Sequence, residues 1–198
     1  SIVNAVAKFA NKDGIAVKDL ENLLKFSLNT GAKAEDNLQF NNLINKFSGD
    51  ILTALRTGAV APDIADSAYL NVIRYIPQSN KVLMRKKLLA ISSVLLPLKK
   101  FELASKYYNQ VLLDKNDDFD ALWGLVLCEA ECRNNEELEN TDYNFAETKN
   151  YIRAYRAATR ENQNKLNIIY KKWSESKEKR KFKPLTDKIM KKLGVSCE

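Results

Sequence analysis

The stretch "KKFELASKYYNQVLLDKNDDFDALWGL", residues 99–125, contains two runs of helical periodicity joined by a short polar segment. In the first run Ala104 and Tyr108 lie four residues apart, so they share one face of a helix. The second run, which begins "FDALWGL", keeps the same period. The stretch therefore predicts one helix over about 99–113 and a second over about 119–132.

The rest of the chain shows the same helical period. Only six Gly and four Pro interrupt 198 residues, and no stretch alternates between apolar and polar residues as a half-buried strand does. In the segment 16–28, for example, Val17, Leu20 and Leu24 fall on one face. The sequence therefore predicts an all-α fold. Further helices are expected at about 34–58, with a possible break at Gly49, and at about 62–76, 81–96, 144–175, with a break near Asn162, and 184–193.

Residues 85–118 form the most regular unit of the chain. Its first helix carries the apolar residues Leu88, Ile91 and Leu95 with the small residue Ser92, and its second helix carries Ala104, Tyr108 and Val111. This pattern resembles the tetratricopeptide repeat, an antiparallel helix pair of about 34 residues. It departs from that pattern at Leu95, where an aromatic residue is usual, and at Val111, where alanine is usual. The resemblance implies a right-handed solenoid of antiparallel helix pairs in a single α-helical repeat domain over 1–198.

A second unit of the repeat is expected from about Phe119. Val126 occupies its small position and Gly124 lies two residues early. An acidic insertion, "RNNEELENTDYN", delays the partner helix to about residue 145. The second unit therefore matches the pattern less closely than 85–118 does.

The resemblance also implies a binding surface. In tetratricopeptide proteins, residues of the first helices that point away from their partner helix line a concave face. The matching positions here are Lys86, Leu89, Ser93, Asp120, Trp123 and Leu127. The resemblance thus predicts a protein-interaction module that holds a peptide or a partner helix, with Trp123 as a large, rigid anchor. The alternative for Trp123 is that it packs against the following helix.

Charge is distributed unevenly along the chain. Between Asp114 and Glu147, 11 acidic residues face only Lys115 and Arg133, a local charge of −9. From Lys171 to Glu198, ten basic residues face four acidic ones, a local charge of +6. The net charge of +7 therefore owes much to the C-terminal part of the chain. No uniform basic face of the kind that duplex DNA favours is indicated.

One helix face between these regions is basic. Lys149, Arg153, Arg156 and Arg160 are spaced four, three and four residues apart. Interleaved Tyr151 and Tyr155 could act as stacking platforms for single-stranded nucleic acid, which gives a second hypothesis, a nucleic-acid-binding helical domain that uses the basic stripe 149–160 and the basic tail. In the simpler interpretation the tyrosines face a neighbouring helix and the arginines are solvated. The nucleic-acid hypothesis is the less favoured of the two.

The C-terminal part of the chain is expected to close the solenoid. Leu166, Ile169, Tyr170 and Trp173 form a stripe with spacings of three, one and three, which predicts a buried face. Residues 176–198 are a basic segment or a capping helix. A basic amphipathic helix can also lie on an anionic membrane or bind an acidic partner.

Catalytic chemistry finds little support in the sequence. The chain has no histidine, and its three cysteines, Cys128, Cys132 and Cys197, do not have the spacing of a structural zinc site. No phosphate-binding loop and no nucleophile motif is present. We therefore expect neither an enzyme nor a metal or cofactor site, and we expect the thiols to be reduced. A sensor domain that binds a small ligand or a signalling peptide remains a third functional hypothesis.

The cellular setting follows from composition alone. The longest apolar stretch, residues 88–98, is interrupted by two serines and a proline and is shorter than the roughly 20 residues of a bilayer span. The abundance of Lys and Asn is typical of AT-rich bacterial genomes. We expect a cytoplasmic segment of a larger bacterial protein, with a protein or peptide as its partner.

Overall fold

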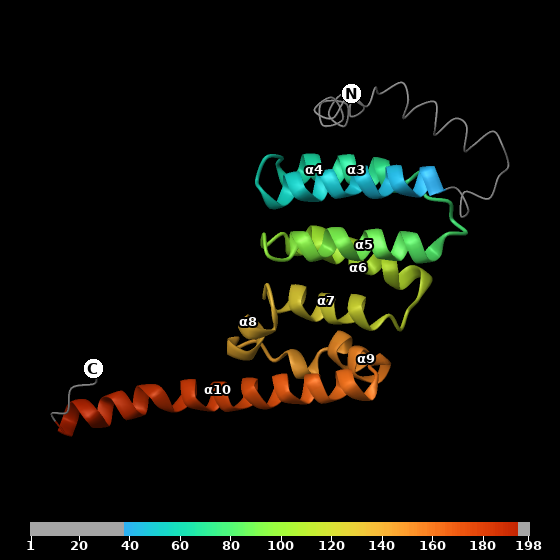
Figure 1. The fold of residues 1–198 in the computed structure, drawn as a ribbon. Helices are drawn as coiled ribbons and strands as arrows, with labels where there is room; N and C mark the ends of the chain where they lie inside the picture. Colours follow the sequence, from blue (N-terminus) through green and yellow to red (C-terminus); the bar gives the residue numbers. More distant parts are fainter. Residues whose placement is uncertain (1–37, 194–198) are drawn as a thin grey trace. The chain divides into compact units, whose positions relative to one another are not determined.

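A computed structural model describes residues 38–193, with the side chains of residues 38–40, 43 and 185–193 left aside. Every regular element in this part of the chain is helical, which confirms the predicted all-α class for the described residues (Figure 1). The helix expected at 16–28 and Cys197 lie outside the described residues. The elements are α3 (Leu38–Arg56), α4 (Pro62–Ile73), α5 (Lys81–Leu95), α6 (Phe101–Asp114), α7 (Phe119–Glu129), α8 (Asn135–Asn140), the short 3-10 helix η3 (Phe145–Glu147), α9 (Lys149–Ala157) and α10 (Arg160–Leu193).

The chain divides into two compact units, with the border between Leu95 and Leu96. Helices α3 to α5 belong to unit 1, and α6 to α10 belong to unit 2. The border falls inside the repeat predicted at 85–118, so its first helix belongs to one unit and its second helix to the other. The tetratricopeptide-like arrangement therefore stays a prediction.

In unit 1, α3 runs through Gly49 without a break. Apolar residues on both sides of the glycine, such as Phe47 and Ile51, are buried on one face, and this burial outweighs the cost of about 1 kcal/mol of a mid-helix glycine. The helix ends at Arg56, and Gly58, which the sequence predicts as its stop, lies in the turn that follows. Gly58 has a φ of 71°, a left-handed conformation that suits glycine at a helix C-terminus. Pro62 then opens α4, where its missing N–H costs nothing.

A buried lysine connects the helices of unit 1. Lys87 of α5 is only 7% exposed, and its Nζ donates to Ser48 Oγ of α3 at 2.8 Å. The Ser48 hydroxyl donates in turn to the Ile44 carbonyl at 2.6 Å. Tyr69 of α4 donates its hydroxyl to the Lys87 carbonyl at 2.7 Å. Burial lowers the pKa of Lys87, and the neighbouring positive charge of Lys86 lowers it further. One residue thus links all three helices through hydrogen bonds.

In unit 2, α6 and α7 pack closely at a glycine. A Cβ atom added to Gly124 of α7 would lie 2.2 Å from Cζ of Tyr108 on α6, which is far inside van der Waals contact. The Tyr108 ring therefore lies directly over the α7 backbone, and Tyr108 is 6% exposed. Burial raises its pKa. The close approach occurs at Gly124 rather than at Val126, the small position of the family pattern.

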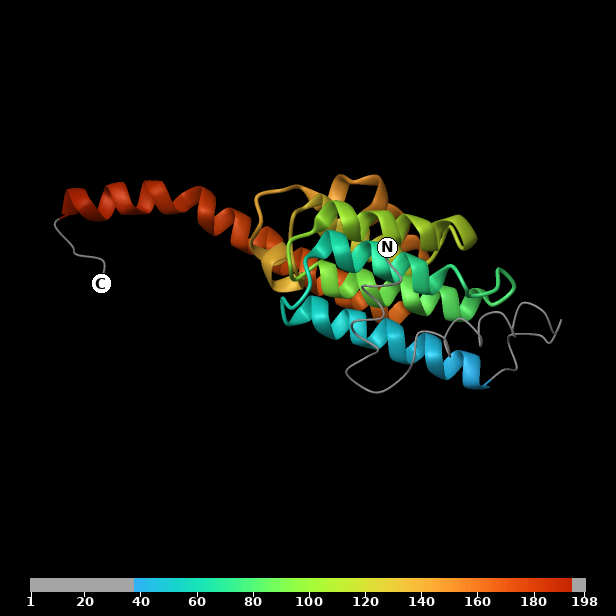
Figure 2. The ribbon, with the colours of Figure 1, turned by 90° about the horizontal axis from the view of Figure 1, so that it is seen from above.

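The C-terminal helix pair differs from the sequence prediction in two respects. The break lies at Ala158 and Thr159 rather than near Asn162, because Thr159 Oγ1 accepts from the Asn162 N–H at 3.3 Å and caps α10. The helix expected at 184–193 is the end of α10, which continues through Pro184. A proline there removes one N–H donor, and water can reach the freed carbonyl because residues 181–184 are exposed. This end of α10 extends away from the other helices of unit 2 (Figure 2).

Candidate functional site: an aromatic groove between α9 and α10

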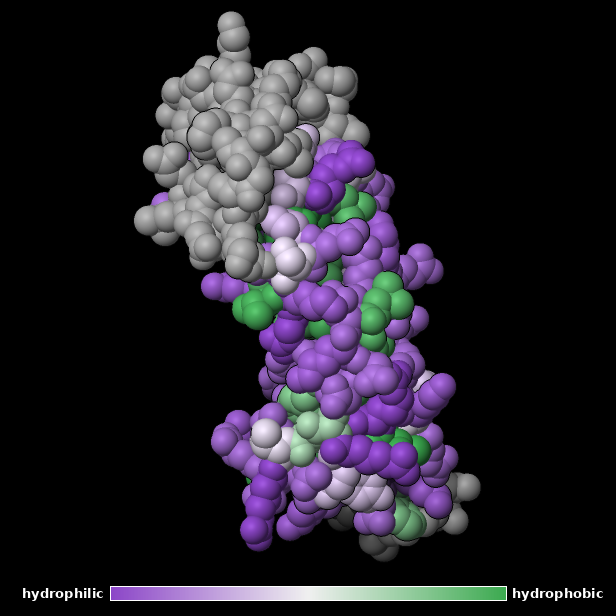
Figure 3. Space-filling model, turned by 90° about the vertical axis from the view of Figure 1, so that its right-hand side faces the viewer, coloured by the Kyte–Doolittle hydropathy of each residue, from purple (hydrophilic) through white to green (hydrophobic). Residues whose placement is uncertain are grey.

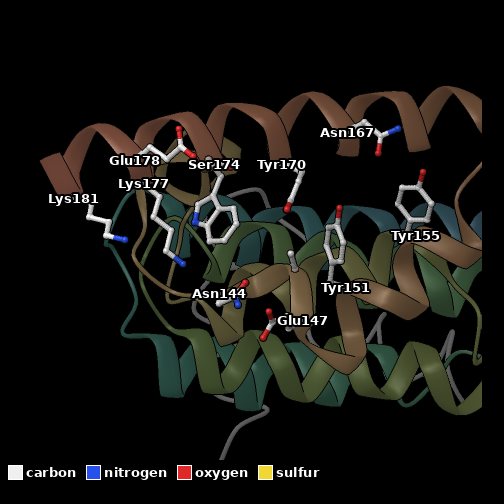
Figure 4. A pocket seen from close by; sticks show the side chains of 12 residues that line it. Asn144, Glu147, Tyr151, Tyr155, Asn167, Tyr170, Ser174, Lys177, Glu178 and Lys181 are labelled. Carbon is white, nitrogen blue, oxygen red and sulfur yellow. The ribbon is translucent and has the colours of Figure 1, made fainter.

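An open groove of about 740 Å³ lies in unit 2 between η3 and α9 on one side and α10 on the other. Its volume falls in the range of small-molecule and cofactor sites. Aromatic rings line its middle, and charged side chains line the end toward the C-terminus of α10 (Figure 4). The lining residues are Asn144, Ala146, Glu147, Tyr151, Tyr155, Asn167, Tyr170, Trp173, Ser174, Lys177, Glu178 and Lys181.

The groove exists because α10 is attached to α8 and packs only lightly against α9. One face of α10 carries the side chains that make this attachment. The bonds are Lys172 to Glu139 at 3.2 Å, Ser176 to Asn140 at 3.1 Å, Arg180 to Asp142 at 2.9 Å, and Arg180 to the Thr141 carbonyl at 2.8 Å. The neighbouring face of α10 is left to line the groove. The acidic insertion is therefore neutralised in part by α10, whose second half, from residue 176, the sequence assigns to a basic segment or capping helix.

Trp173 lines the floor of the groove, and the buried ring of Phe145, which is not itself a lining residue, packs against it. Phe145 of η3 is fully buried, with its ring centroid 5.4 Å from that of Tyr151 and 5.1 Å from that of Trp173. Both pairs are close to edge-to-face, the favoured arrangement of aromatic rings. Trp173 is buried too, and its Nε1 donates to the Thr141 carbonyl at 2.9 Å. The floor is held firmly by packing and by one hydrogen bond.

Three tyrosines form the walls. Tyr151 and Tyr155 are half-buried, with ring centroids 6.3 Å apart on α9, while Tyr170 of α10 is 45% exposed. Tyr170 reaches from α10 toward Tyr151 in Figure 4. Burial raises the pKa of Tyr151, and its proximity to Tyr155 and Tyr170 raises it further. The Tyr151 phenol is therefore neutral near pH 7 and, like the other two hydroxyls, can both donate and accept hydrogen bonds at a ligand.

Charged residues of both signs line the other end of the groove. The Lys177 ammonium lies 4.6 Å from the centroid of the Trp173 ring, a cation–π contact. Lys181 follows one helical turn later, with Glu178 beside it and Glu147 facing them from η3. Within the described part of the chain, none of these four charged groups forms an ion pair. They are therefore available to a ligand.

The six residues predicted for a concave face fall in two groups. Lys86, Leu89 and Ser93 lie on α5 of unit 1, where Leu89 is partly exposed and the other two are exposed. Asp120, Trp123 and Leu127 lie on α7 of unit 2, where Asp120 is exposed and Leu127 is buried. Each group is a row on one helix face, and whether the two groups form one surface stays a prediction.

Trp123 belongs to the aromatic cluster beside the groove. Its ring centroid lies 6.3 Å from that of Tyr151, and its Nε1 donates to Asn135 Oδ1 at 3.0 Å. The side chain is partly exposed. Trp123 thus contacts the helix that forms one wall of the groove without lining the groove itself.

The basic stripe has one member with a clear structural role. Arg153 donates from Nη2 to the Asn116 carbonyl at 2.6 Å, which ties α9 to the loop before α7. Lys149, Arg156 and Arg160 are exposed. The interleaved Tyr151 and Tyr155 line the groove, in which Lys177 and Lys181 are the cations.

Sequence reasoning missed two parts of this site. It placed Tyr170 in a buried stripe, whereas Leu166, Ile169 and Trp173 are buried and Tyr170 is exposed. It also did not single out Lys177 and Lys181. The available signal was the recurrence of aromatic residues at helical spacing on two consecutive helices, one of which continues into a lysine-rich segment.

The two described cysteines do not line the groove. Cys128 and Cys132 are buried free thiols, and burial raises the pKa of both. Over residues 38–193 no three potential metal ligands come together. None of the helices there is long and apolar enough to cross a membrane.

Comparison with protein-family models, with curated proteins and with solved structures found no match to this chain. The functional argument therefore rests on the residues and geometry of the groove.

Proposed function

We propose that this chain is a protein-interaction module of tetratricopeptide-like type that binds a peptide segment of a partner protein in the groove between α9 and α10. The observation that carries the proposal is the exposure of Tyr170, opposite Tyr151 and Tyr155, above a rigid aromatic floor. Large aromatic side chains supply contact area at low entropic cost and dominate the energetics of protein interfaces.

Exposed apolar side chains elsewhere in the described residues are scattered. Exposed apolar side chains such as Val82, Leu113 and Ile64 are far apart in sequence and lie on different helices. The face in Figure 3 shows hydrophobic residues in separate small patches within a mainly hydrophilic surface. Single exposed apolar residues are normal for a protein surface. The aromatic groove is therefore the best candidate for a docking site.

The mixed charge of the groove favours a peptide over a nucleic acid. A peptide presents isolated charges together with N–H and C=O groups, which suit a site that holds both lysine and glutamate side chains. A single strand carries a phosphate at every nucleotide and would meet Glu147 and Glu178 in the groove. The nucleic-acid hypothesis, which uses the basic stripe 149–160 and the basic tail, remains the alternative, and Lys177 and Lys181 of the tail would be its phosphate contacts in the groove.

The test is selection of peptides from a random displayed library on the purified chain, followed by affinity measurements with two tyrosine variants. Tyr170→Ala is expected to weaken a selected peptide by about tenfold or more, because it removes a central contact. Tyr143→Ala is the matched control, since Tyr143 is 41% exposed and lies outside the groove. Selected peptides that bind both variants as tightly as the natural chain would contradict the proposal.

A further inference from the structure

The basic side chains of the last part of α10 are divided between two tasks. Lys172 and Arg180 are bonded to carboxylates of the α8 region, at 3.2 and 2.9 Å. Lys177 and Lys181 instead line the groove and have no carboxylate partner among the described residues. Two lysines one turn apart, aimed into the same groove, are a place for an anionic group from outside the chain.

The surroundings of these lysines favour a negative ligand group. From Lys171 to Lys183 the helix carries seven basic residues and two acidic ones. Glu178 and Glu147 also reach the groove, so the site is not a uniform cationic trough. Such a site suits one isolated carboxylate, whose chain can also offer N–H donors to the two glutamates. A continuous polyanion would suit it less, because each further phosphate meets a carboxylate.

The distance between the aromatic and basic parts of the groove sets the number of residues between the aromatic and the acidic residue of a bound peptide. Lys177 and Lys181 follow Tyr170 by seven and eleven residues on one helix, which corresponds to about 10 and 16 Å along its axis. An extended peptide advances about 3.3 Å per residue. A peptide lying along α10 therefore places an acidic side chain at the lysines when this residue is roughly three to five positions away from an aromatic one.

We infer that the groove recognises an aromatic side chain between Tyr151, Tyr155 and Tyr170 and, three to five residues away, a carboxylate bound by Lys177 and Lys181. This inference rests on the proposed peptide-binding function and adds the chemistry of the partner. The aromatic contact supplies most of the affinity. The carboxylate fixes the direction in which the peptide lies and distinguishes acidic partners from neutral ones.

The test uses dye-labelled synthetic peptides of ten residues in a Ser-Gly background, each with one tryptophan and one aspartate separated by three residues. A second set has asparagine in place of aspartate, and anisotropy reports binding. The aspartate peptide is expected to bind about two- to fivefold more tightly than the asparagine peptide at low salt, as for an exposed ion pair. The preference is expected to fall as salt rises.

Paired variants locate the effect. Lys177→Gln with Lys181→Gln is expected to abolish the preference for aspartate. Lys179→Gln with Lys183→Gln removes the same charge from exposed positions outside the groove and is expected to keep the preference. Both pairs lie in a solvated part of α10, and circular dichroism checks that the helix persists.

Three outcomes would overturn the inference. Equal affinity for the aspartate and asparagine peptides, with binding that depends on Tyr170, would show that the groove does not recognise a carboxylate. The proposed peptide-binding function would still stand. Binding of neither peptide would reject this motif, while the library selection decides separately on the proposed function. Tighter binding of a ten-nucleotide deoxythymidine strand, lost in the Lys177 and Lys181 variant, would favour the nucleic-acid alternative.

Discussion

Two helix contacts of unit 2 use the same residue type in opposite ways. At the α6–α7 contact, Tyr108 lies over Gly124 and is 6% exposed. Beside α9, Tyr170 of α10 lies next to the buried Trp173 ring and is 45% exposed. The first contact is closed because a glycine lets the helices approach, and the second is open because α10 is attached to α8 instead. The comparison indicates that Tyr170, unlike Tyr108, is not needed to fill the core.

The largest expected effect is the loss of Tyr108. Tyr108→Ala removes a buried ring from the closed contact and is expected to cost about 3–5 kcal/mol in unfolding free energy, because the cavity over Gly124 cannot fill. Urea denaturation followed by circular dichroism measures this cost. A cost below about 1 kcal/mol would show that the α6–α7 contact is not closed.

Overpacking of the same contact is expected to have an intermediate effect. Gly124→Ala places a Cβ 2.2 Å from the Tyr108 ring, so the helices must separate, at a cost of about 1–3 kcal/mol less the gain of about 1 kcal/mol from removing a helical glycine. Ala104→Leu, at a fully buried position of α6, is expected to cost about 1–3 kcal/mol. Thermal denaturation compares both variants with the natural chain. A rise in melting temperature for either variant would contradict this packing.

The closed helix contact of unit 1 contains the buried amine of Lys87, and the contribution of this amine to stability depends on pH. The pKa of Lys87 is lowered in the folded state, so between this value and the ordinary value near 10.5 the unfolded chain binds more protons than the folded chain. The contribution of Lys87 to stability therefore rises with pH through this window and is constant below it.

The matched variant isolates the lysine from other titrating groups. Lys87→Met fills a similar volume, and Ser48 keeps its hydrogen bond to the Ile44 carbonyl. The difference in stability between the natural chain and the variant is expected to change with pH in alkaline solution, in favour of the natural chain as pH rises. A difference that does not depend on pH would mean that Lys87 keeps its ordinary pKa.

The smallest effect on stability is expected at the open site. Tyr170→Ala removes a side chain that is 45% exposed and is expected to change the unfolding free energy by less than about 1 kcal/mol, close to the effect of Tyr143→Ala. The same urea measurement serves both variants. A loss of unfolding free energy comparable to that of Tyr108→Ala would show that Tyr170 belongs to the core. The contrast between the two tyrosines would then be wrong.

The all-α class of the described residues was predictable because helical periodicity reports local burial, whereas the tetratricopeptide-like arrangement stays a prediction. The turn at Gly58 after α3 and the start of α4 at Pro62 follow from residue chemistry, and both are found. The position of the groove was not predictable, because it depends on which neighbour α10 is attached to. Long-range bonds such as Arg180 to Asp142 decide this, and periodicity carries no information about them. The same limit explains why Tyr170 was wrongly predicted to be buried, since its burial depends on how closely α9 packs against α10.

The central claim is that the groove between α9 and α10, rather than the predicted row on α5, receives the partner. NMR titration of the labelled chain with a library-selected peptide tests it most directly. We expect shifts in the side-chain signals of Tyr151, Tyr155 and Tyr170, and little change at Leu89 and Ser93. Shifts centred on Leu89 and Ser93, with the three tyrosines unchanged, would contradict it.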